Sequence, residues 1–473
     1  MGLAIITFFA FIFRLIGSNQ SFWLDEGASI SIARLPLANI LGAAGSDVHP
    51  PLSYLLLHFW LPLAGKSEWL IRFPNILIGT LAIPALYFLL KTIFPKDKNN
   101  LPLLASLLLA LNPLHIYYSM ELRMYSLNAL LSIFSWTYLV KALTEKEKNT
   151  KSWQVFTLLS LANVYTFYGS FFNLIAQLIY VIYKHRTKLK PFVLSQLLLV
   201  TLFLPWLPTL RTQLTNGGIL RQSLPGWSVV SGTLSIKSLG LIMAKFILGR
   251  ISLANKTAYA LFVAGVSLYF LLCSVLTYLR RELRPLLIWF YIPVIVATVI
   301  SLKIPLLGYW RFTFIIPAFV SIVAYGLSNL PKSARNFNYI VVILVFVLGN
   351  LIFWTNPVFQ REDWRGASQL INEPKSISIV NFPGPFAPLQ FYAPNVYYYA
   401  DQESLGKMRT DLDQSLPLVL KDKQRVFVFD YLSDLSDPKR SILHWLKQAG
   451  FKQVKVHNYN SVGFIYEFAP PKI

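Results

Sequence analysis

Two adjacent acids, Asp25 and Glu26, are the residues most open to a chemical role. They occur in the stretch SFWLDEGASIS, directly after the first apolar segment of the chain. Neighbouring carboxylates repel each other, and an ionisable group beside a membrane is costly, so such a pair is a candidate for function. Trp23 is an aromatic anchor of the kind found at membrane interfaces. We predict that the acids are held at the interface near a lipid-borne substrate, with pairing to a loop arginine as the alternative.

Three arginines in apolar surroundings form a second set. Arg72 begins an apolar run, Arg123 occurs in SMELRMYS, and Arg311 follows Tyr309 in LLGYWRFTFIIP. An arginine beside an aromatic ring at headgroup depth can bind a phosphate through two parallel hydrogen bonds. For a single arginine, snorkelling toward the lipid headgroups is the simpler explanation. Because three lie on one predicted face, we treat them, with Tyr309, as candidate substrate-binding residues.

The segment SDVHPPL places Asp47 two residues before His49. Both are metal-ligand types, and the two prolines after His49 stiffen the chain there. One Asp and one His make an incomplete ligand set. We therefore predict no dedicated metal site, leave a divalent cation as an alternative, and count both residues as candidates for substrate binding.

The composition places these residues in a membrane protein. Of the 473 residues, 55% are hydrophobic and 14% are charged, whereas soluble globular proteins carry about 25% charged residues. The net charge of +22 would suggest nucleic-acid binding. The Lys and Arg residues, however, gather in short loops between apolar segments, as the positive-inside rule describes. We therefore expect a membrane partner and no nucleic acid.

Eleven apolar runs are long enough to predict a mainly α-helical polytopic membrane protein. They cover residues 2–18, 70–91, 101–118, 124–143, 153–168, 170–184, 191–210, 257–279, 285–302, 312–330 and 338–355. With this count all the Lys/Arg-rich loops fall on one side, which predicts a cytoplasmic N-terminus and an extracytoplasmic tail at the cell membrane. In the long outer loop, residues 19–69, we expect two helices lying on the membrane surface.

The tail has the pattern of a small soluble α/β domain. Three strand-like runs and one helical run are indicated, and the last run contains a turn between two strands. These runs cover residues 376–382, 424–432, 438–450 (the helix) and 451–468. We predict a membrane domain at 1–355 and an extracytoplasmic domain at 356–473. Of the 21 acidic residues, only five belong to the predicted outer face of the membrane domain: Asp25, Glu26, Asp47, Glu68 and Glu121.

Several motifs in order along the chain resemble the bacterial branch of glycosyltransferase family 39. Relatives of that family include the protein O-mannosyltransferases and the lipid A aminoarabinose transferases. The motifs are RLIGSNQSFWLDEGAS, DVHPPLSYLLLHFW, RFPNILIGTLAI, NPLHIYYSMELRMYSL, LPWLP and REDWRGASQLI. The resemblance implies a C-type membrane glycosyltransferase fold. It also implies a hexosyl- or pentosyltransferase that moves a sugar from a polyprenyl-phosphate carrier to a lipid, glycan or protein acceptor of the cell envelope.

The resemblance also implies residue roles. Asp25 would be the general base that takes the proton from the acceptor hydroxyl as it attacks the anomeric carbon. Because this is one direct displacement, the transfer would proceed with inversion. Glu26 would orient the base or the acceptor. Arg123, with Glu121 and Tyr125 beside it, would neutralise the charge of the departing polyprenyl phosphate. The small tail, in place of a large inserted loop domain, departs from the protein mannosyltransferases and counts against a protein acceptor.

Two other classes of protein would share part of this pattern. A transporter or flippase of a lipid-linked sugar would also need ionisable groups, but transporters usually place them at the bilayer midplane and often have repeated halves. A structural subunit of a polysaccharide export complex would carry outer acids without a cavity around them. The clustering of acids at one interface favours the enzyme.

Overall fold

The computed structural model describes residues 1–96, 100–145, 150–405 and 407–471. Parts of two basic loops, residues 97–99 and 146–149, lie outside the described residues. The contacts between residues divide the chain into two compact units. We call them the helical unit (Met1–Ser18, Leu35–Gln213 and Val230–Thr355) and the α/β unit (Asn19–Arg34, Leu214–Val229 and Asn356–Ile473). Two segments from the predicted membrane domain, residues 19–34 and 214–229, therefore cluster with the tail.

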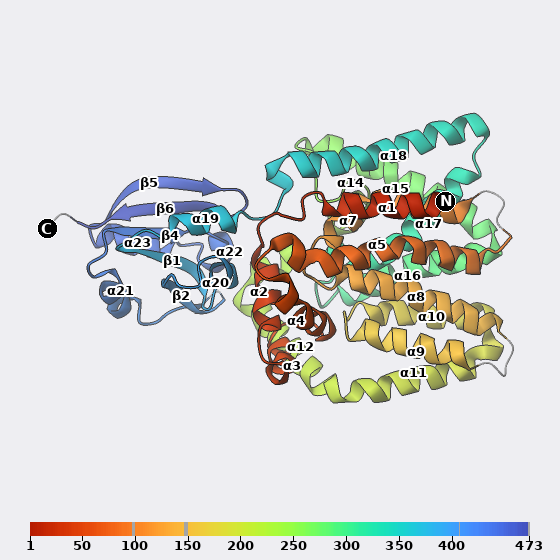
Figure 1. The fold of residues 1–473 in the computed structure, drawn as a ribbon, viewed down its shortest axis with the longest axis horizontal. Coiled ribbons are helices and arrows are strands. Elements are labelled where there is room, and N and C mark those ends of the chain that lie inside the picture. Colours follow the sequence, from red (N-terminus) through yellow and green to blue (C-terminus); the bar gives the residue numbers. More distant parts are fainter. Residues whose placement is uncertain (97–99, 146–149, 406, 472–473) are drawn as a thin grey trace. The chain divides into compact units, whose positions relative to one another are not determined.

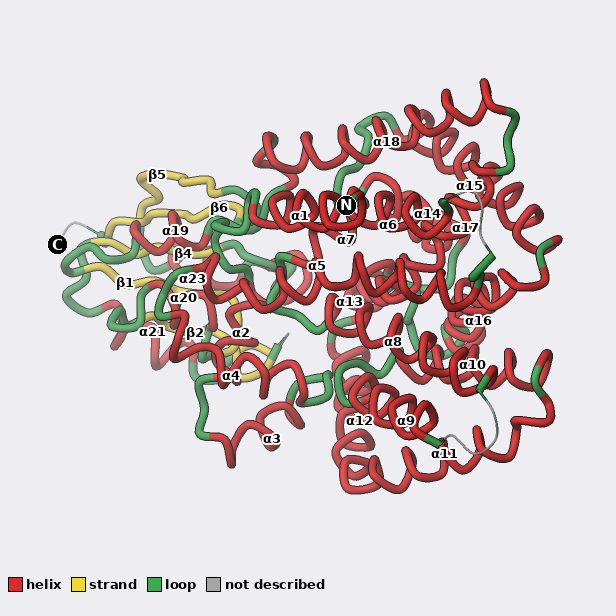
Figure 2. Tube along the Cα trace, turned by 45° about the vertical axis from the view of Figure 1, so that its right-hand side comes forward, coloured by secondary structure: helices red, strands yellow, loops and turns green. Residues whose placement is uncertain are grey.

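The helical unit consists of helices, the longer of which run side by side (Figures 1 and 2). In chain order they are α1 (Gly2–Leu15), α3 (Leu37–Ser46), α4 (Leu52–Ala64), α5 (Glu68–Ile93), α6 (Leu101–Leu111), α7 (Pro113–Ser119), α8 (Tyr125–Thr144), α9 (Lys151–Val164), α10 (Ser170–Lys184), α11 (Leu189–Phe203), the start of α12 (Leu207–Ser223), α14 (Ile236–Leu248), α15 (Lys256–Leu279), α16 (Arg284–Ile300), a 3₁₀ helix (Tyr309–Ile315), α17 (Ile316–Ser328) and α18 (Lys332–Thr355).

Within the described residues, six helical stretches are long and apolar enough to cross a membrane. They are Glu68–Ile93, Arg186–Ser223, Lys256–Leu279, Arg281–Ile300, Tyr309–Ser328 and Lys332–Thr355. Helices α6 and α7 add a seventh if this pair, bent by 62°, forms one span. The other four predicted spans correspond to α1, α8, α9 and α10, which are helical but fall outside this set. The protein is thus an integral membrane protein with several spans, and the count of eleven is not confirmed.

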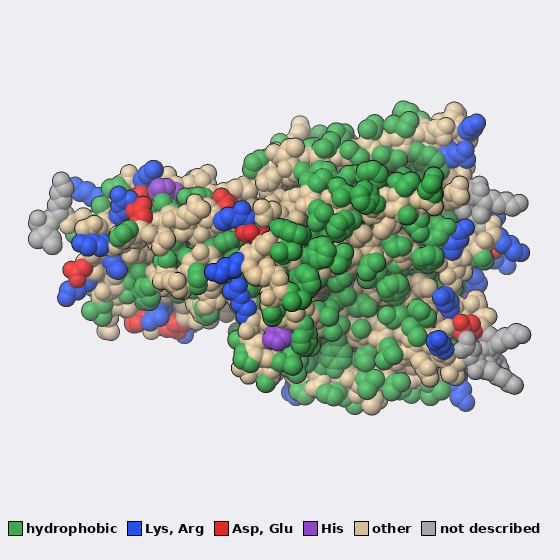
Figure 3. Space-filling view, viewed as in Figure 1, with side chains coloured by type: hydrophobic (Ala, Val, Ile, Leu, Met, Phe, Trp, Pro, Cys, Tyr) green, Lys and Arg blue, Asp and Glu red, His purple; other side chains and the backbone are tan. Residues whose placement is uncertain are grey.

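The surface of the helical unit fits a lipid environment. In Figure 3, hydrophobic side chains cover the face of its helices that is in view, and Lys and Arg side chains gather at one end of the helices. Exposed leucines include Leu194 and Leu197 on α11, and Leu268 and Leu271 on α15. Such a continuous apolar surface would be a liability in water and is expected against lipid.

The predicted surface helices differ in number from those observed. Between α1 and α5 the chain forms three helices, α2 (Leu24–Ala33), α3 and α4, where we predict two. The break between α2 and α3 occurs at Pro36, which is the N-cap residue of α3. Proline lacks an amide donor and disfavours the helical conformation of the residue before it, which favours a break at this position.

The α/β unit is built around a six-stranded mixed sheet in the order β3-β2-β1-β4-β6-β5. Strands β1, β2 and β4 are parallel, and the other pairs are antiparallel. The strands are β1 (Ser376–Pro383), β2 (Tyr398–Ser404), β3 (Lys407–Met408), β4 (Arg425–Phe429), β5 (Lys452–Tyr459) and β6 (Gly463–Ala469). The predicted strands β1 and β4 and the β5–β6 hairpin are confirmed, whereas β2 and β3 carry too few β-branched residues to be recognised.

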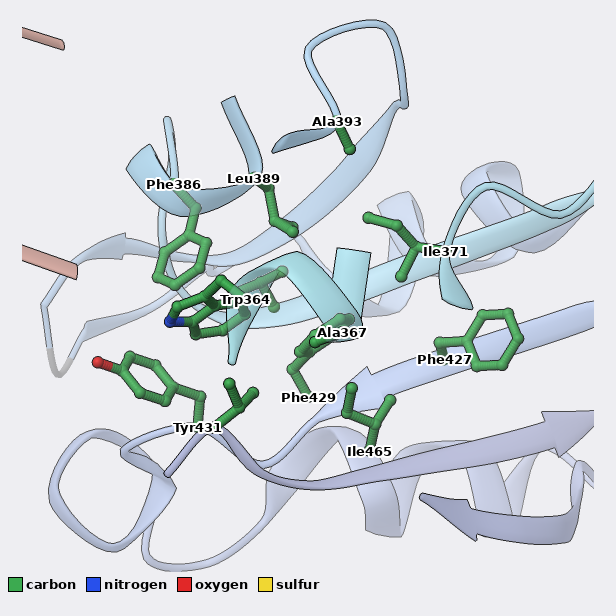
Figure 4. Packing of buried hydrophobic residues seen from close by; sticks show 12 residues of the cluster. Trp364, Ala367, Ile371, Phe386, Leu389, Ala393, Phe427, Phe429, Tyr431 and Ile465 are labelled. Carbon is green, nitrogen blue, oxygen red and sulfur yellow. The ribbon is translucent and has the colours of Figure 1, made fainter. Parts of the chain in front are cut away.

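Helices cover both faces of this sheet (Figure 1). They are α19 (Trp364–Leu370), α20 (Ala387–Tyr392), α21 (Leu412–Leu420), α22 (Ser433–Ser436) and α23 (Ser441–Gln448). Trp364 of α19 is fully buried in the cluster on one face, against Phe386 and Phe429 (Figure 4). On the other face Leu416 of α21 and Leu446 of α23 pack against the alternate side chains of the same strands. This period of two is what a sheet buried on both sides requires.

Candidate functional site

Asp25 and Glu26 lie in the first turn of α2, in the α/β unit. Negative charge in the first turn of a helix is stabilised by the helix dipole. The two neighbours have different surroundings, because Asp25 is partly buried whereas Glu26 is 0% exposed. The pair predicted from the sequence therefore contains one fully buried carboxylate, that of Glu26, and one that solvent can reach, that of Asp25.

The buried member of the pair has a cationic partner. The Nη1 atom of Arg361 lies 3.7 Å from Oε2 of Glu26, and both side chains are almost completely buried. A carboxylate removed from water without a partner would be strongly destabilising. Arg361 therefore allows Glu26 to remain charged in the interior.

The next residue, Glu362, holds the start of α2. Its Oε2 atom accepts hydrogen bonds from the backbone N–H of Leu24 at 3.2 Å and from Nε1 of Trp364 at 2.7 Å. Its Oε1 atom accepts one from the hydroxyl of Tyr431 at 2.8 Å. The first N–H groups of a helix have no partner within the helix, and the N-cap residue Trp23 is a poor capping type. Glu362 thus supplies a cap from a distant part of the chain.

The pKa of Glu362 reflects this environment. Burial, with a smaller contribution from the nearby charge of Asp25, raises the pKa of this carboxyl to about 7, although the hydrogen bonds from Trp364, Tyr431 and Leu24 act in the opposite direction. Trp364 and Tyr431 both belong to the hydrophobic cluster on one face of the sheet. The indole nitrogen of Trp364 and the hydroxyl of Tyr431 point to the same side of this cluster in Figure 4. Glu362 is therefore a carboxyl that exchanges its proton near neutral pH.

Further contacts attach the segment around α2 to the rest of the α/β unit. The backbone N–H of Phe22 donates to the hydroxyl of Tyr392 at 2.7 Å, and that of Arg365 donates to Oγ of Ser21 at 3.0 Å. Gly27 lies so close to α20 that a Cβ atom at this position would be 3.1 Å from the backbone nitrogen of Pro388. The glycine after the acid pair therefore permits α2 to lie directly on α20.

The other predicted site residues belong to the helical unit. Asp47 follows α3, and its Oδ2 atom accepts a hydrogen bond from the hydroxyl of Tyr54 and lies 4.0 Å from Nη1 of Arg123. Burial alone would raise the pKa of Asp47, but the neighbouring His49, the charge of Arg123 and the bond from Tyr54 lower it overall. Burial, and then the charge of Arg123, lower the pKa of His49 to about 3. Asp47 is therefore ionised and His49 neutral at pH 7.

Arg72, Glu121 and Tyr125 are buried in the same unit. The Nη1 atom of Arg72 donates to the carbonyl oxygen of Ser18 at 2.7 Å and so ties α5 to the end of α1. The ring of Tyr125 packs edge-to-face on that of Tyr118 with centroids 4.7 Å apart. The Glu121 and Arg123 carbonyl oxygens both accept hydrogen bonds from the side chain of Asn75. These contacts hold the turn before α8 in a defined conformation.

A second cationic group surrounds Tyr309 and Arg311. The Nη1 atom of Arg311 donates to the carbonyl oxygens of Ser231 and Pro305, at 2.5 and 3.2 Å. The hydroxyl of Tyr309 accepts a hydrogen bond from Nη1 of Arg250 at 2.8 Å. The Nζ atom of Lys245 donates to the carbonyl oxygens of Arg250 and Ile251. Arg250 and Lys245 were not among the predicted residues, because the segment 211–256 shows only a general excess of basic residues.

No metal centre is formed by the part of the chain that the structure describes. In those residues no group of three or more His, Cys, Asp and Glu side chains could hold a metal ion. Asp47 and His49 thus gain no third ligand of these types from the tertiary structure.

Comparison with known families identifies the class of protein. Residues 48–209 match the family PMT_2, described as dolichyl-phosphate-mannose-protein mannosyltransferase. The chain is a membrane glycosyltransferase that is similar to this family over residues 48–209, about a third of its length. The matched residues include His49, Arg72, Glu121 and Arg123, and the match begins directly after Asp47. Among curated proteins no significant match to the sequence of this glycosyltransferase is found.

Solved structures share the fold of the glycosyltransferase over its whole length. ArnT from Cupriavidus metallidurans, bound to undecaprenyl phosphate, is 13% identical and has a TM-score of 0.64, with 99% of this chain and 97% of that chain covered. The archaeal oligosaccharyltransferase AglB from Archaeoglobus fulgidus, in complex with an inhibitory peptide and a dolichol-phosphate, is 12% identical. Its TM-score is 0.55, with 98% of this chain and 73% of that chain covered. At such low identities the likeness concerns the fold.

Arg361, Glu362 and Tyr431 are the residues near α2 that sequence reasoning missed. The motif REDWRGASQLI was noted only for its family resemblance, yet four charged residues in five positions at the start of a soluble domain are a usable signal. The glycosyltransferase uses two of these charges to hold the segment WLDE.

Proposed function

We propose that this glycosyltransferase transfers a sugar from a polyprenyl-phosphate-linked donor to an acceptor at the outer face of the membrane, with inversion. The donor class is supported by the dolichyl phosphate in the family's description and by the polyprenyl phosphates bound to two proteins of the same fold. The acceptor is a lipid, a glycan or a protein.

The proposed topology comprises eleven spans, with the N-terminus in the cytoplasm. The four additional spans are α1, α8, α9 and α10, and the agreement of the basic loops supports this count. The C-terminal domain, residues 356–473, then lies outside the cytoplasm. In this topology a nucleotide sugar would be on the wrong side of the membrane for Asp25, and a lipid carrier would be the available donor.

The observation that carries the proposed mechanism is the unequal environment of the acid pair. Glu26 is fully buried and paired with Arg361, so it cannot exchange a proton with a substrate. Asp25 is partly exposed on the same helical turn. In the proposed reaction, Asp25 takes the proton of the acceptor hydroxyl while that oxygen attacks the anomeric carbon and the bond to the carrier phosphate breaks. Glu26 orients Asp25 by fixing the helix that carries it.

The cations of the helical unit are proposed to bind the donor phosphate. Arg123 lies beside Asp47 at 4.0 Å, and the Tyr309 hydroxyl orients Arg250. Arg311 adds positive charge while its hydrogen bonds go to backbone carbonyl oxygens. Cations placed where charge develops stabilise a departing phosphate. Arg72, Glu121 and Tyr125 would maintain the conformation of this group, and His49 would contribute a neutral polar surface.

The test is a single-turnover transfer assay with the purified full-length protein and a polyprenyl-phosphate sugar, given extracted cell-envelope lipids and glycans as acceptors. Asp25→Asn should lower the rate by roughly 10²–10⁴-fold, the usual contribution of a general base. Asp422→Asn is the matched control, because Asp422 is an exposed acid of the same unit and its left-handed backbone, with φ of 62°, also suits asparagine. Full activity of Asp25→Asn would refute the assignment of the base.

A further inference from the structure

The α/β unit contains a pocket of about 410 Å³ that is lined in part by Glu362, the residue that accepts a hydrogen bond from the N–H of Leu24 in α2. This volume is within the roughly 300–1,000 Å³ of small-ligand sites. The pocket is lined by Glu362, by Tyr431 and Leu432 two and three residues after the end of β4, and by residues 458–463, which run from the end of β5 through the turn to the first residue of β6. It therefore lies at the carboxyl end of the parallel strand β4, the end at which open α/β sheets bind ligands.

The polar groups of this pocket suit hydroxyls. Asn458 and Ser461 are exposed, and within the described part of the chain neither side chain makes a hydrogen bond, so both can bond to a ligand. Tyr431 and Tyr459 also line the pocket and supply aromatic surface for the apolar face of a sugar ring. Above pH 7, where Glu362 is largely ionised, its carboxylate disfavours a phosphate or another anion. A ligand with many neutral hydroxyl groups fits this set.

Glu362 connects the pocket with the helix of the acid pair. The same carboxyl that lines the pocket accepts the hydrogen bond from the N–H of Leu24, one residue before Asp25. The charge of Asp25 also influences the pKa of Glu362, so the two carboxyls lie within electrostatic reach of each other. A ligand in the pocket is thus held next to the first turn of α2.

We propose that this pocket binds a sugar unit of the acceptor, and hence that the acceptor is a glycan or a glycolipid. This inference rests on the proposed transfer reaction, in which Asp25 removes the proton of an acceptor hydroxyl. Asn458, Ser461 and Glu362 bind the hydroxyls of the sugar, and Tyr459 contacts its ring.

The test uses the full-length protein in lipid nanodiscs and saturation-transfer NMR with three probes: methyl α-mannoside, methyl β-galactoside and N-acetylglucosamine. Asn458→Trp fills the pocket with an indole on a strand that accepts aromatic residues. We expect the saturation transfer to at least one probe to fall roughly fivefold or more, because the indole occupies the pocket and the hydrogen bond to Asn458 is lost. Val454→Trp is the matched control, because Val454 lies on the same strand, is 57% exposed and does not line the pocket; this variant should bind as the wild type does.

Equal signals for all three probes in the wild type and in Asn458→Trp, or no signal in either, would overturn the pocket assignment. In transfer assays Asn458→Trp should also raise the KM for the acceptor roughly tenfold and leave the KM for the donor unchanged. The binding experiment needs no turnover. If glycosides bind in the pocket and no transfer is detected with any acceptor, the proposed reaction fails and the binding site stands.

Discussion

The two charged regions of this protein use their charges differently. In the α/β unit, Glu26 is neutralised by the side chain of Arg361 in the interior. In the helical unit, Arg311 donates to the backbone carbonyl oxygens of Ser231 and Pro305. A carbonyl oxygen satisfies a hydrogen bond but does not cancel a charge, so the positive potential of Arg311 persists. The first arrangement fixes a helix, and the second keeps a charge available for an anion such as a lipid phosphate.

The largest expected effect concerns the buried ion pair. Arg361→Met leaves Glu26 buried without its cation and should cost about 3–5 kcal/mol in the free energy of unfolding. The double variant Arg361→Met/Glu26→Leu should recover most of this loss. Both are measured by thermal unfolding in detergent.

The control for that experiment is Arg409→Met. Arg409 pairs with Asp411 at 2.7 Å, but both side chains are about 40% exposed, and such surface pairs contribute less than about 1 kcal/mol. Equal losses in Arg361→Met and Arg409→Met would show that burial of the pair has no energetic consequence.

The next effect is the pH dependence that Glu362 confers. Its pKa of about 7 in the folded protein exceeds the ordinary value of 4.5, so the folded state binds this proton more tightly than the unfolded state. The contribution to stability is complete below pH 4.5 and is lost as the pH rises to about 7, with a total of about 3 kcal/mol. Glu362→Gln resembles the protonated form. We expect this variant to match the wild type at pH 5 and to unfold at a higher temperature than the wild type at pH 8.

Another group in the same unit titrates in a similar range. Burial, together with the charge of Asp437, raises the pKa of Asp401 to about 8. The difference in stability between the wild type and Glu362→Gln at each pH isolates the contribution of the Glu362 carboxyl. The variant Asp401→Asn should still lose the stability that Glu362 confers as the pH rises to about 7. Parallel stability curves for the wild type and Glu362→Gln from pH 5 to 8 would contradict the assignment.

A smaller effect is expected in the helical unit. Tyr309→Phe removes the hydrogen bond that orients Arg250 and should weaken the binding of undecaprenyl phosphate roughly fivefold, equivalent to about 1 kcal/mol. Binding is measured by microscale thermophoresis. Tyr87→Phe serves as the control, since the ring of Tyr87 contacts Lys91 on α5 instead. An unchanged Kd in Tyr309→Phe would show that the orientation of Arg250 by Tyr309 does not contribute to binding of the phosphate.

The smallest effect is expected for His49. Because its pKa is about 3, this residue carries no charge between pH 5 and 8. His49→Gln should therefore change the affinity for undecaprenyl phosphate less than about twofold and leave the pH profile of binding unchanged across that range. A shift of that profile would show that His49 titrates near neutral pH.

Local patterns were sufficient to predict much of the fold. Apolar runs indicated the long helices, and alternation with turn residues indicated β1, β4 and the β5–β6 hairpin. Pro36 was a local signal for the break between α2 and α3, but our prediction did not use it and gave one helix for the segment. The adjacent acids of α2 were recognised because their charge contrasts with apolar neighbours. In each case the information lies within about twenty residues of chain, where hydration and backbone hydrogen bonding depend on neighbouring residue types.

The partners of those acids depend on the tertiary structure. Leu24 and Glu362 are 338 positions apart, and Glu26 and Arg361 are separated by a similar distance in the chain. No local pattern links such residues, because an ion pair across that distance forms only when the sheet and its helices have brought both segments together. The residue types in WLDE and REDW could be recognised from the sequence. Which carboxylate is buried and which stays accessible was decided by the packing of α2 on α20 and by the bond from its first turn to Glu362.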